Sequence, residues 1–144
     1  MLIDVAFTPS EVQAIDSKVC VVIDVIRATS SLTVILSKKP DKVILTTTIM
    51  KTNKIASQLT VHPLLCGERK GLPPEGFDFG NSPGEYFKAD LLGKTVIFTS
   101  SNGTRAIADV TVAANVYLGC FLNGSAVAKK AYDYAVAHEK DILF

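Results

Sequence analysis

The chain has 144 residues, which is about the length of one domain and long enough to bury a hydrophobic core. Apolar residues make up 48% of the sequence and charged residues 20%, so the composition excludes a disordered protein. The formal net charge of +1 argues against a nucleic-acid-binding protein that relies on a broad basic surface.

The predicted elements alternate between strands and helices along the chain. Apolar runs and alternating polarity predict the strands, and apolar residues at helical spacing predict the helices. In chain order they are a strand over 2–7, a helix start at Thr8, Pro9 and Glu11, a strand over 19–23, a helix over 30–37, a strand over 43–46, a helix over 49–59 capped by Thr47 or Thr48, strands over 61–66 and 95–99, a short helix over 106–110, a strand over 112–118, a helix over 123–138 and a strand from Asp141. This order predicts an α/β fold, a three-layer α/β/α sandwich with a largely parallel or mixed sheet.

Residues 67–84 differ in texture from the rest of the chain. They contain five glycines and three prolines in 18 residues. A loop of this length inside a compact domain is usually functional or disordered, and Phe77, Phe79 and Tyr86 provide apolar anchors that favour an ordered loop. We therefore expect no domain boundary here and treat 1–144 as a single α/β domain or the N-terminal part of a longer one.

Charged and polar side chains follow three of the predicted strands, at 24–31, 67–69 and 100–104. The carboxyl ends of parallel strands share one edge of a sheet, where ligands bind in open α/β folds. There, Asp24 and Glu68 could share a divalent cation such as Mg²⁺, because hard cations prefer carboxylate oxygens. Arg27 and Arg69 could bind phosphate or carboxylate by forked hydrogen bonds.

Each of these residues also has a plain structural interpretation. Asp24 could cap a turn, Arg27 could pair with Asp24, and Ser101-Asn102-Gly103-Thr104 could be an ordinary turn rather than a helix start that binds an anion. Two carboxylates and two arginines at strand ends nevertheless favour a functional site.

Several phosphate chemistries lack a residue that they need. Cys20 lies within the predicted strand before Arg27, so the thiolate loop of a cysteine phosphatase is missing. Ile26 stands where an aspartyl-phosphate enzyme would carry its second carboxylate, and no Walker-type loop is present. Attack by water with help from a metal ion remains.

Cysteine usage and hydropathy indicate the compartment. Cys20, Cys66 and Cys120 form no C-x-x-C pair and suit free thiols in a reducing compartment. The apolar runs are too short to span a bilayer, and no secretory signal is visible. We expect a cytoplasmic protein without a membrane or nucleic-acid partner.

Five blocks of the sequence resemble, in order, the signature of the 2-phosphosulfolactate phosphatase (ComB) family. They are residues 22–30, 66–69, 76–83, 101–106 and 119–128. The resemblance implies a three-layer α/β fold and a Mg²⁺-dependent phosphatase that hydrolyses 2-phosphosulfolactate to sulfolactate and phosphate, a step towards coenzyme M. The site residues we expect are Asp24, Arg27, Glu68 and Arg69 in catalysis, Asp24 and Glu68 as metal ligands, and Thr29, Ser30, Asn81, Asn102, Gly103 and Thr104 in binding of substrate or phosphate.

The chain departs from the family pattern in two respects. Ser100 and Ser101 stand where threonines are common, which is a mild chemical change. Family members are also longer, so further acidic and glycine-rich segments are expected beyond Phe144, and the metal site would be incomplete without them.

Three hypotheses follow for the function. The first is a metal-dependent phosphatase acting on a small acidic phosphoester. The second is a catalytically incomplete module that binds anions. The third is a partner-dependent half-domain whose apolar end, Ile142 to Phe144, is an exposed strand edge that pairs with another chain; a homodimer is also left open.

Overall fold

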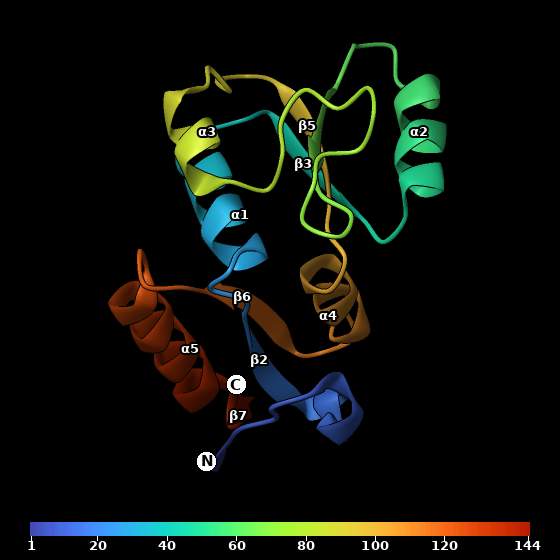
Figure 1. Ribbon diagram of the computed structural model, residues 1–144. Coiled ribbons are helices and arrows are strands. Elements are labelled where there is room, and N and C mark those ends of the chain that lie inside the picture. The colour runs from blue at the N-terminus through green and yellow to red at the C-terminus, as the bar shows by residue number, and fades with distance from the viewer.

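The computed structural model of the chain describes residues 1–144, apart from the side chain of Pro9. It is an α/β structure of seven strands and five α-helices with two short 3-10 helices near the N-terminus (Figure 1). In chain order these are β1 (Ile3–Asp4), the 3-10 helices Pro9–Glu11 and Ile15–Ser17, β2 (Lys18–Ile23), α1 (Ala28–Ser37), β3 (Lys42–Thr46), α2 (Ile49–Gln58), β4 (Leu64–Gly67), α3 (Pro83–Lys88), β5 (Thr95–Thr99), α4 (Gly103–Asp109), β6 (Asn115–Gly119), α5 (Gly124–His138) and β7 (Asp141–Leu143).

The strands form two sheets, in the orders β1-β7-β2-β6 and β3-β5-β4. Every strand pair in both sheets is parallel, which confirms the predicted α/β class. The prediction placed all the strands in one sheet, whereas the structure divides them. The division arises because β2 pairs with β6 and β7 from the end of the chain, while the three intervening strands pair with one another.

Helices cover both sheets (Figure 1). Helix α5 packs on β2, β6 and β7, and α2 packs on β3 and β5. Helix α1 follows β2 in the chain but packs closely against α3, beside the other sheet. The α1 helix therefore links the two sheets.

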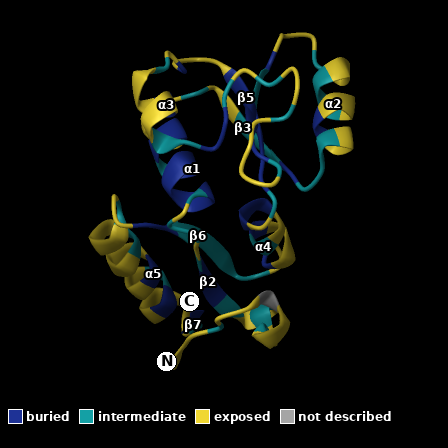
Figure 2. Ribbon diagram, viewed as in Figure 1, coloured by how far each residue is buried: buried dark blue, intermediate teal, exposed yellow. Residues whose placement is uncertain are grey.

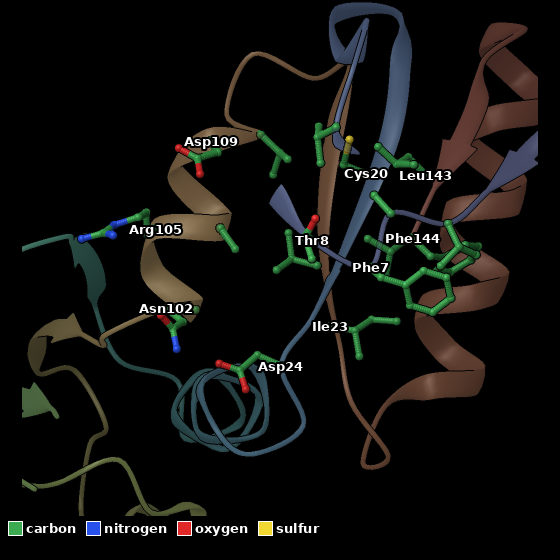
Figure 3. Close-up of a pocket in the computed structure, with 18 residues that line it drawn as sticks. Phe7, Thr8, Cys20, Ile23, Asp24, Asn102, Arg105, Asp109, Leu143 and Phe144 are labelled. Carbon is green, nitrogen blue, oxygen red and sulfur yellow. The ribbon is translucent and has the colours of Figure 1, made fainter. Parts of the chain in front are cut away.

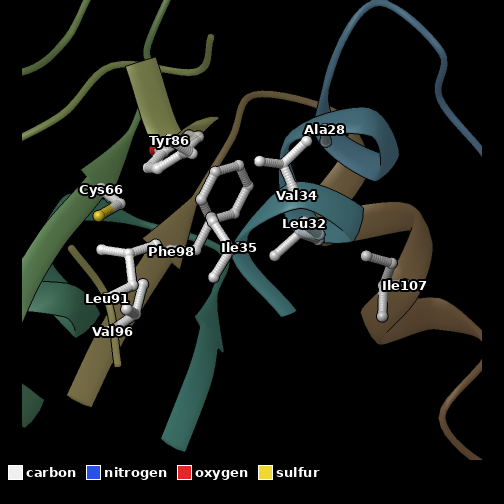
Figure 4. Close-up of a cluster of buried hydrophobic side chains, with 10 residues drawn as sticks. All are labelled: Ala28, Leu32, Val34, Ile35, Cys66, Tyr86, Leu91, Val96, Phe98 and Ile107. Atoms are coloured by element: carbon white, nitrogen blue, oxygen red, sulfur yellow. The ribbon is translucent and has the colours of Figure 1, made fainter. Parts of the chain in front are cut away.

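The largest hydrophobic cluster lies between α1 and the β3-β5-β4 sheet (Figure 4). Strand β5 is buried along its whole length, and Phe98 and Ile35 are completely inaccessible to solvent (Figure 2). Truncating a buried phenylalanine such as Phe98 to alanine costs about 3–5 kcal/mol. A second cluster, including Val19 and Ala131, lies between β2 and α5.

Two short elements differ from the sequence predictions. The expected helix start after Thr8 is only a 3-10 turn over Pro9–Glu11. Helix α3 was not predicted, because its six residues follow a stretch rich in glycine and proline and are too few to display a helical period. Its start fits helix chemistry, since Pro83 occupies the first turn.

The predicted edge strand at the end of the chain is wrong. Strand β7 lies between β1 and β2 and pairs with both, so its two sides are already occupied. Ile142 and Leu143 are buried there. The strand before α5 begins at Asn115, three residues later than predicted, whereas Thr48 caps α2 as expected by accepting a hydrogen bond from the Lys51 N–H at 3.1 Å.

Candidate active site

A cavity of about 330 Å³ lies where the carboxyl ends of β2, β4 and β5 come together. Its lining includes five of the ten residues that the sequence predicted for the site. The cavity is lined by Asp24, Ile26, Arg27, Glu68, Lys70, Gly71, Asn81, Ser101 and Asn102. Side chains from both sheets therefore meet at one polar pocket.

The loop between β2 and α1 is held by hydroxyl groups that bind its own backbone. Thr29 is fully buried, and its Oγ1 lies 2.8 Å from the Asp24 carbonyl, 2.7 Å from the Gly119 carbonyl and 3.0 Å from the Asp24 N–H. The Ser30 hydroxyl donates to the Val25 carbonyl at 2.8 Å. The structure thus places these two predicted ligand-binding hydroxyls outside the cavity lining, where they fix the loop that carries Asp24.

Asp24 is partly buried and lies against the N-terminus of α4 (Figure 3). A Cβ added at Gly103 would lie 2.7 Å from Asp24 Oδ2 and 2.4 Å from the Ala28 Cβ. The absence of a side chain at Gly103 therefore allows the carboxylate and α1 to approach α4 this closely. The Asp24 carboxylate accepts no hydrogen bond from the residues that the structure describes, so both its oxygens are available to a ligand.

The Glu68 carboxylate, by contrast, is occupied by hydrogen bonds. Oε1 accepts the Ser101 N–H at 2.5 Å, and Oε2 accepts the Gly71 N–H at 2.7 Å and the Ser101 hydroxyl at 3.0 Å. Burial alone would raise the pKa of Glu68, but these three hydrogen bonds outweigh it, and the pKa is lowered. In this arrangement, Glu68 joins the loop after β4 to the turn after β5.

The two arginines differ in their surroundings. Arg27 lines the cavity, and its Nη2 donates to the Gly71 carbonyl at 3.4 Å. The Arg69 guanidinium lies outside the cavity lining and donates to the carbonyls of Glu68 and Thr47 at 2.7 and 2.9 Å and to Thr99 Oγ1 at 2.6 Å. Burial lowers the pKa of Arg69. Arg27 is therefore the arginine placed to contact a ligand.

The remaining predicted residues also divide between cavity and scaffold. Asn81 lines the cavity and is 6% exposed, and its Oδ1 is buried with no partner among the described residues. Asn102 is exposed at the rim. Thr104 lies outside the lining and pairs with Ser100: the Ser100 N–H donates to Thr104 Oγ1 at 3.1 Å, and the Thr104 N–H donates to Ser100 Oγ at 2.9 Å.

Lys70 also lines the cavity, and the sequence prediction omitted it. Its backbone has a φ of +53°, and the following Gly71 has a φ of +83°. A Lys-Gly pair directly after Glu-Arg in a glycine-rich loop was the available signal for a tight turn at this point.

The oxygen donors at the cavity determine whether it could hold Mg²⁺. Among the described residues, no group of three or more His, Cys, Asp or Glu side chains is arranged to hold a metal ion. Mg²⁺ commonly uses only one or two carboxylates, with water and substrate phosphate as the other ligands. Asp24, with both oxygens available, fits that mode, and Asn81, whose buried Oδ1 has no partner among the described residues, lines the same cavity. Glu68 would first have to release its hydrogen bonds.

The three cysteines do not supply a nucleophile to the cavity. All three cysteines are free and buried, and none lines the cavity. Burial raises the pKa of Cys66 to about 12. A larger apolar groove of about 680 Å³ adjoins the cavity and shares Asp24 and Asn102 with it (Figure 3).

None of the described helices is long and apolar enough to cross a membrane.

The chain is similar to named proteins along most of its length. Residues 6–144 match the family model of 2-phosphosulpholactate phosphatase. A protein of Clostridium acetobutylicum named "Probable 2-phosphosulfolactate phosphatase" is 41% identical over 132 residues, which cover 90% of this chain and 56% of that protein. Proteins with the same name in Pseudothermotoga lettingae and Clostridium perfringens strain SM101 are 43% and 40% identical, covering 90% and 100% of this chain and 54% and 59% of their own lengths.

The chain spans a little over half the length of these curated relatives. The residues of this chain that line the cavity lie between Asp24 and Asn102, within the part that matches the family model. With the family model matching nearly the entire chain at this level of identity to named relatives, the chain belongs to the 2-phosphosulfolactate phosphatase family.

Proposed function

We propose that this chain carries the active site of a Mg²⁺-dependent phosphatase that hydrolyses 2-phosphosulfolactate to sulfolactate and phosphate. The observation that carries the proposal is the cavity in which Asp24, Arg27 and Asn102 meet. An available carboxylate beside a guanidinium suits a substrate that arrives with a metal ion and several acidic groups. The names of the relatives support the same substrate.

Asp24 is the residue that would hold Mg²⁺, with Asn81 able to add a neutral oxygen at the same cavity. The chemistry that the ion supplies when bound is charge neutralisation at the phosphoryl oxygens and a lower pKa for a water molecule. Glu68 was predicted as a second ligand, and in that role it would exchange its hydrogen bonds from Ser101 and Gly71 for the ion.

Arg27 neutralises phosphoryl or other acidic oxygens by forked hydrogen bonds. Asn102 donates from the rim of the cavity, at the turn that opens α4. Arg69 acts through its hydrogen bonds to Thr47 and Thr99, which hold the end of β4 against β3 and β5. These assignments give Arg27 and Asn102 to the substrate and leave Arg69 and the buried hydroxyls to the scaffold.

The proposal includes a cytoplasmic reaction that leads towards coenzyme M, and a homodimer is compatible with it. Three free, buried cysteines support a reducing compartment.

Free phosphate is the direct readout of hydrolysis. The purified protein should release it from 2-phosphosulfolactate with Mg²⁺, and addition of a chelator or the Asp24→Ala substitution should stop the release. Undiminished release by Asp24→Ala would remove Asp24 from the mechanism.

A second candidate is an anion-binding module without turnover. One observation favours it: both oxygens of the Glu68 carboxylate already accept hydrogen bonds from the protein, so the second predicted metal ligand is occupied. In that case phosphate should raise the melting temperature while no phosphate is released from the ester. Calorimetric scans with and without phosphate, run beside the hydrolysis assay, separate the two candidates.

A further inference from the structure

Lys70 occupies an unusual place in the loop after β4. Arg69 and Leu72 exchange two backbone hydrogen bonds, at 2.9 and 3.2 Å, which closes a two-residue turn around Lys70 and Gly71. Both turn residues have positive φ, at +53° and +83°. Such turns favour Asn-Gly, because a lysine side chain adopts this backbone conformation less readily. Lysine is therefore not the residue that turn geometry alone would select.

The turn is fixed to the walls of the cavity by three hydrogen bonds. The Lys70 N–H donates to Ser101 Oγ at 3.2 Å, the Gly71 N–H donates to Glu68 Oε2 at 2.7 Å, and Arg27 Nη2 donates to the Gly71 carbonyl at 3.4 Å. These bonds fix the Lys70 backbone next to Gly71, whose carbonyl accepts the hydrogen bond from Arg27. Arg27 and Lys70 thus line the same cavity.

Neither Arg27 nor Lys70 forms a salt bridge with a described residue. The Lys129–Asp133 pair on the surface of α5 is the single salt bridge among the described residues. Glu68 is near, but its carboxylate accepts N–H and hydroxyl groups rather than a cation. An arginine and a lysine that line one cavity without forming a salt bridge suit an anion with more than one acidic group, while Asp24 is left for a cation.

We propose that Lys70 is a specificity-determining residue that binds an acidic group of the substrate other than the phosphoryl group. This inference rests on the proposed function and assigns one of its selectivity determinants. Arg27 and Asp24, with the cation that Asp24 would hold, serve the phosphoryl end. Lys70 receives the second acid, the sulfonate, and so disfavours ligands that lack it.

Equilibrium binding tests this assignment independently of turnover. Sulfolactate has two acidic groups and lactate has one, so titration calorimetry with each, in Mg²⁺, gives a ratio of affinities. Lys70→Asn should lower that ratio roughly fivefold, the size expected for one partly exposed charge pair. It should leave the affinity for inorganic phosphate within about twofold, and Lys70→Arg should keep most of the preference for sulfolactate.

Folding and nonspecific charge effects have their own controls. Asparagine suits the turn, so Lys70→Asn should melt at or above the wild-type temperature. Lys130→Asn, an exposed lysine on α5, should leave the ratio unchanged. An unchanged ratio in Lys70→Asn overturns the inference even if the ester is hydrolysed, and so does wild-type protein that does not prefer sulfolactate. A lowered ratio without hydrolysis upholds the inference and overturns the phosphatase proposal.

Discussion

Glu68 and Ser101 are joined by two hydrogen bonds, one from the Ser101 N–H at 2.5 Å and one from its hydroxyl at 3.0 Å. They lie 33 positions apart in the sequence, at the ends of neighbouring strands β4 and β5. A carboxylate that accepts a backbone N–H in a buried position is costly to replace, because its partner would lose a bond without regaining water. This pair therefore ties the two loops that form one wall of the cavity.

The Glu68→Gln substitution should destabilise the protein by about 2 kcal/mol at neutral pH. A glutamine turns an N–H group towards Ser101 or Gly71, where the wild-type carboxylate accepts from both. Urea unfolding measures the loss, with the exposed Glu75→Gln as the control that should change little. If the two variants unfolded at the same urea concentration, Glu68 would not hold the two loops together as we infer.

The same carboxylate should make stability depend on acid. Its pKa in the folded chain is below the ordinary 4.5, so the unfolded chain takes up this proton first as the pH falls. The Glu68 contribution is complete above about pH 4.5 and is lost as the pH falls through the folded-state pKa. The gap in melting temperature between wild type and Glu68→Gln should therefore narrow between pH 6 and pH 3. A constant gap would show that the charge of Glu68 contributes nothing.

The Gly103→Ala substitution should cost about 2 kcal/mol, since overpacking outweighs the better helix propensity of alanine. The new Cβ would lie 2.4 Å from Ala28 and 2.7 Å from Asp24, so α1 and the Asp24 carboxylate would both have to move. Phosphate binding should weaken with the stability. Gly124→Ala is the matched control: it also begins a helix, no atom lies within 4 Å of its added Cβ, and it should be neutral or slightly stabilising.

The Asp24→Asn substitution should separate function from folding. The Asp24 carboxylate accepts no hydrogen bond from the described residues, so the melting temperature should change by only a few degrees. Stabilisation of the protein by Mg²⁺ and phosphate together, and any phosphate release, should fall at least tenfold. Asp109→Asn changes an exposed carboxylate on α4 outside this cavity and should leave both unaffected. If Mg²⁺ stabilised Asp24→Asn as much as the wild type, the ion would bind at a site other than Asp24.

The Thr29→Val substitution keeps the shape of the side chain and removes only its hydroxyl. The Asp24 N–H and the Gly119 carbonyl would then be buried without this partner, so we expect a loss of about 3 kcal/mol. Chemical denaturation is the measurement, and the exposed Thr111→Val serves as the control. A loss below about 1 kcal/mol would show that water replaces the hydroxyl, and that the loop does not depend on Thr29.

The sequence predicted the elements that have a strong period or a long apolar run. The run over 19–23 is strand β2, buried at Val19 to Val21, and Asp24 and Arg27 follow it at the cavity as expected from the α/β rule. The division into two sheets was not predictable, because the polarity of a buried strand does not reveal its neighbour. The local pattern also missed α3, whose six residues are too few.

The charges of the site were predictable, but their partners were not. Glu68 and Arg69 are adjacent in the sequence, yet the carboxylate of one binds Ser101 and the guanidinium of the other binds Thr47 and Thr99. These partners are 22 to 33 positions away and are backbone groups or hydroxyls, which leave no charge pattern in the sequence. Lys70 was not predicted for a related reason: the Lys-Gly pair indicates a turn, but nothing in the local sequence indicates that the turn lines the cavity.

Because the strands form two separately hydrogen-bonded sheets, a ligand in the cavity would contact both sheets and hold them together. Asp24 and Arg27 come from the end of β2, and Ser101 from the end of β5 in the other sheet. Affinity then depends on how firmly the sheets are held together, chiefly through the packing of α1 on α3.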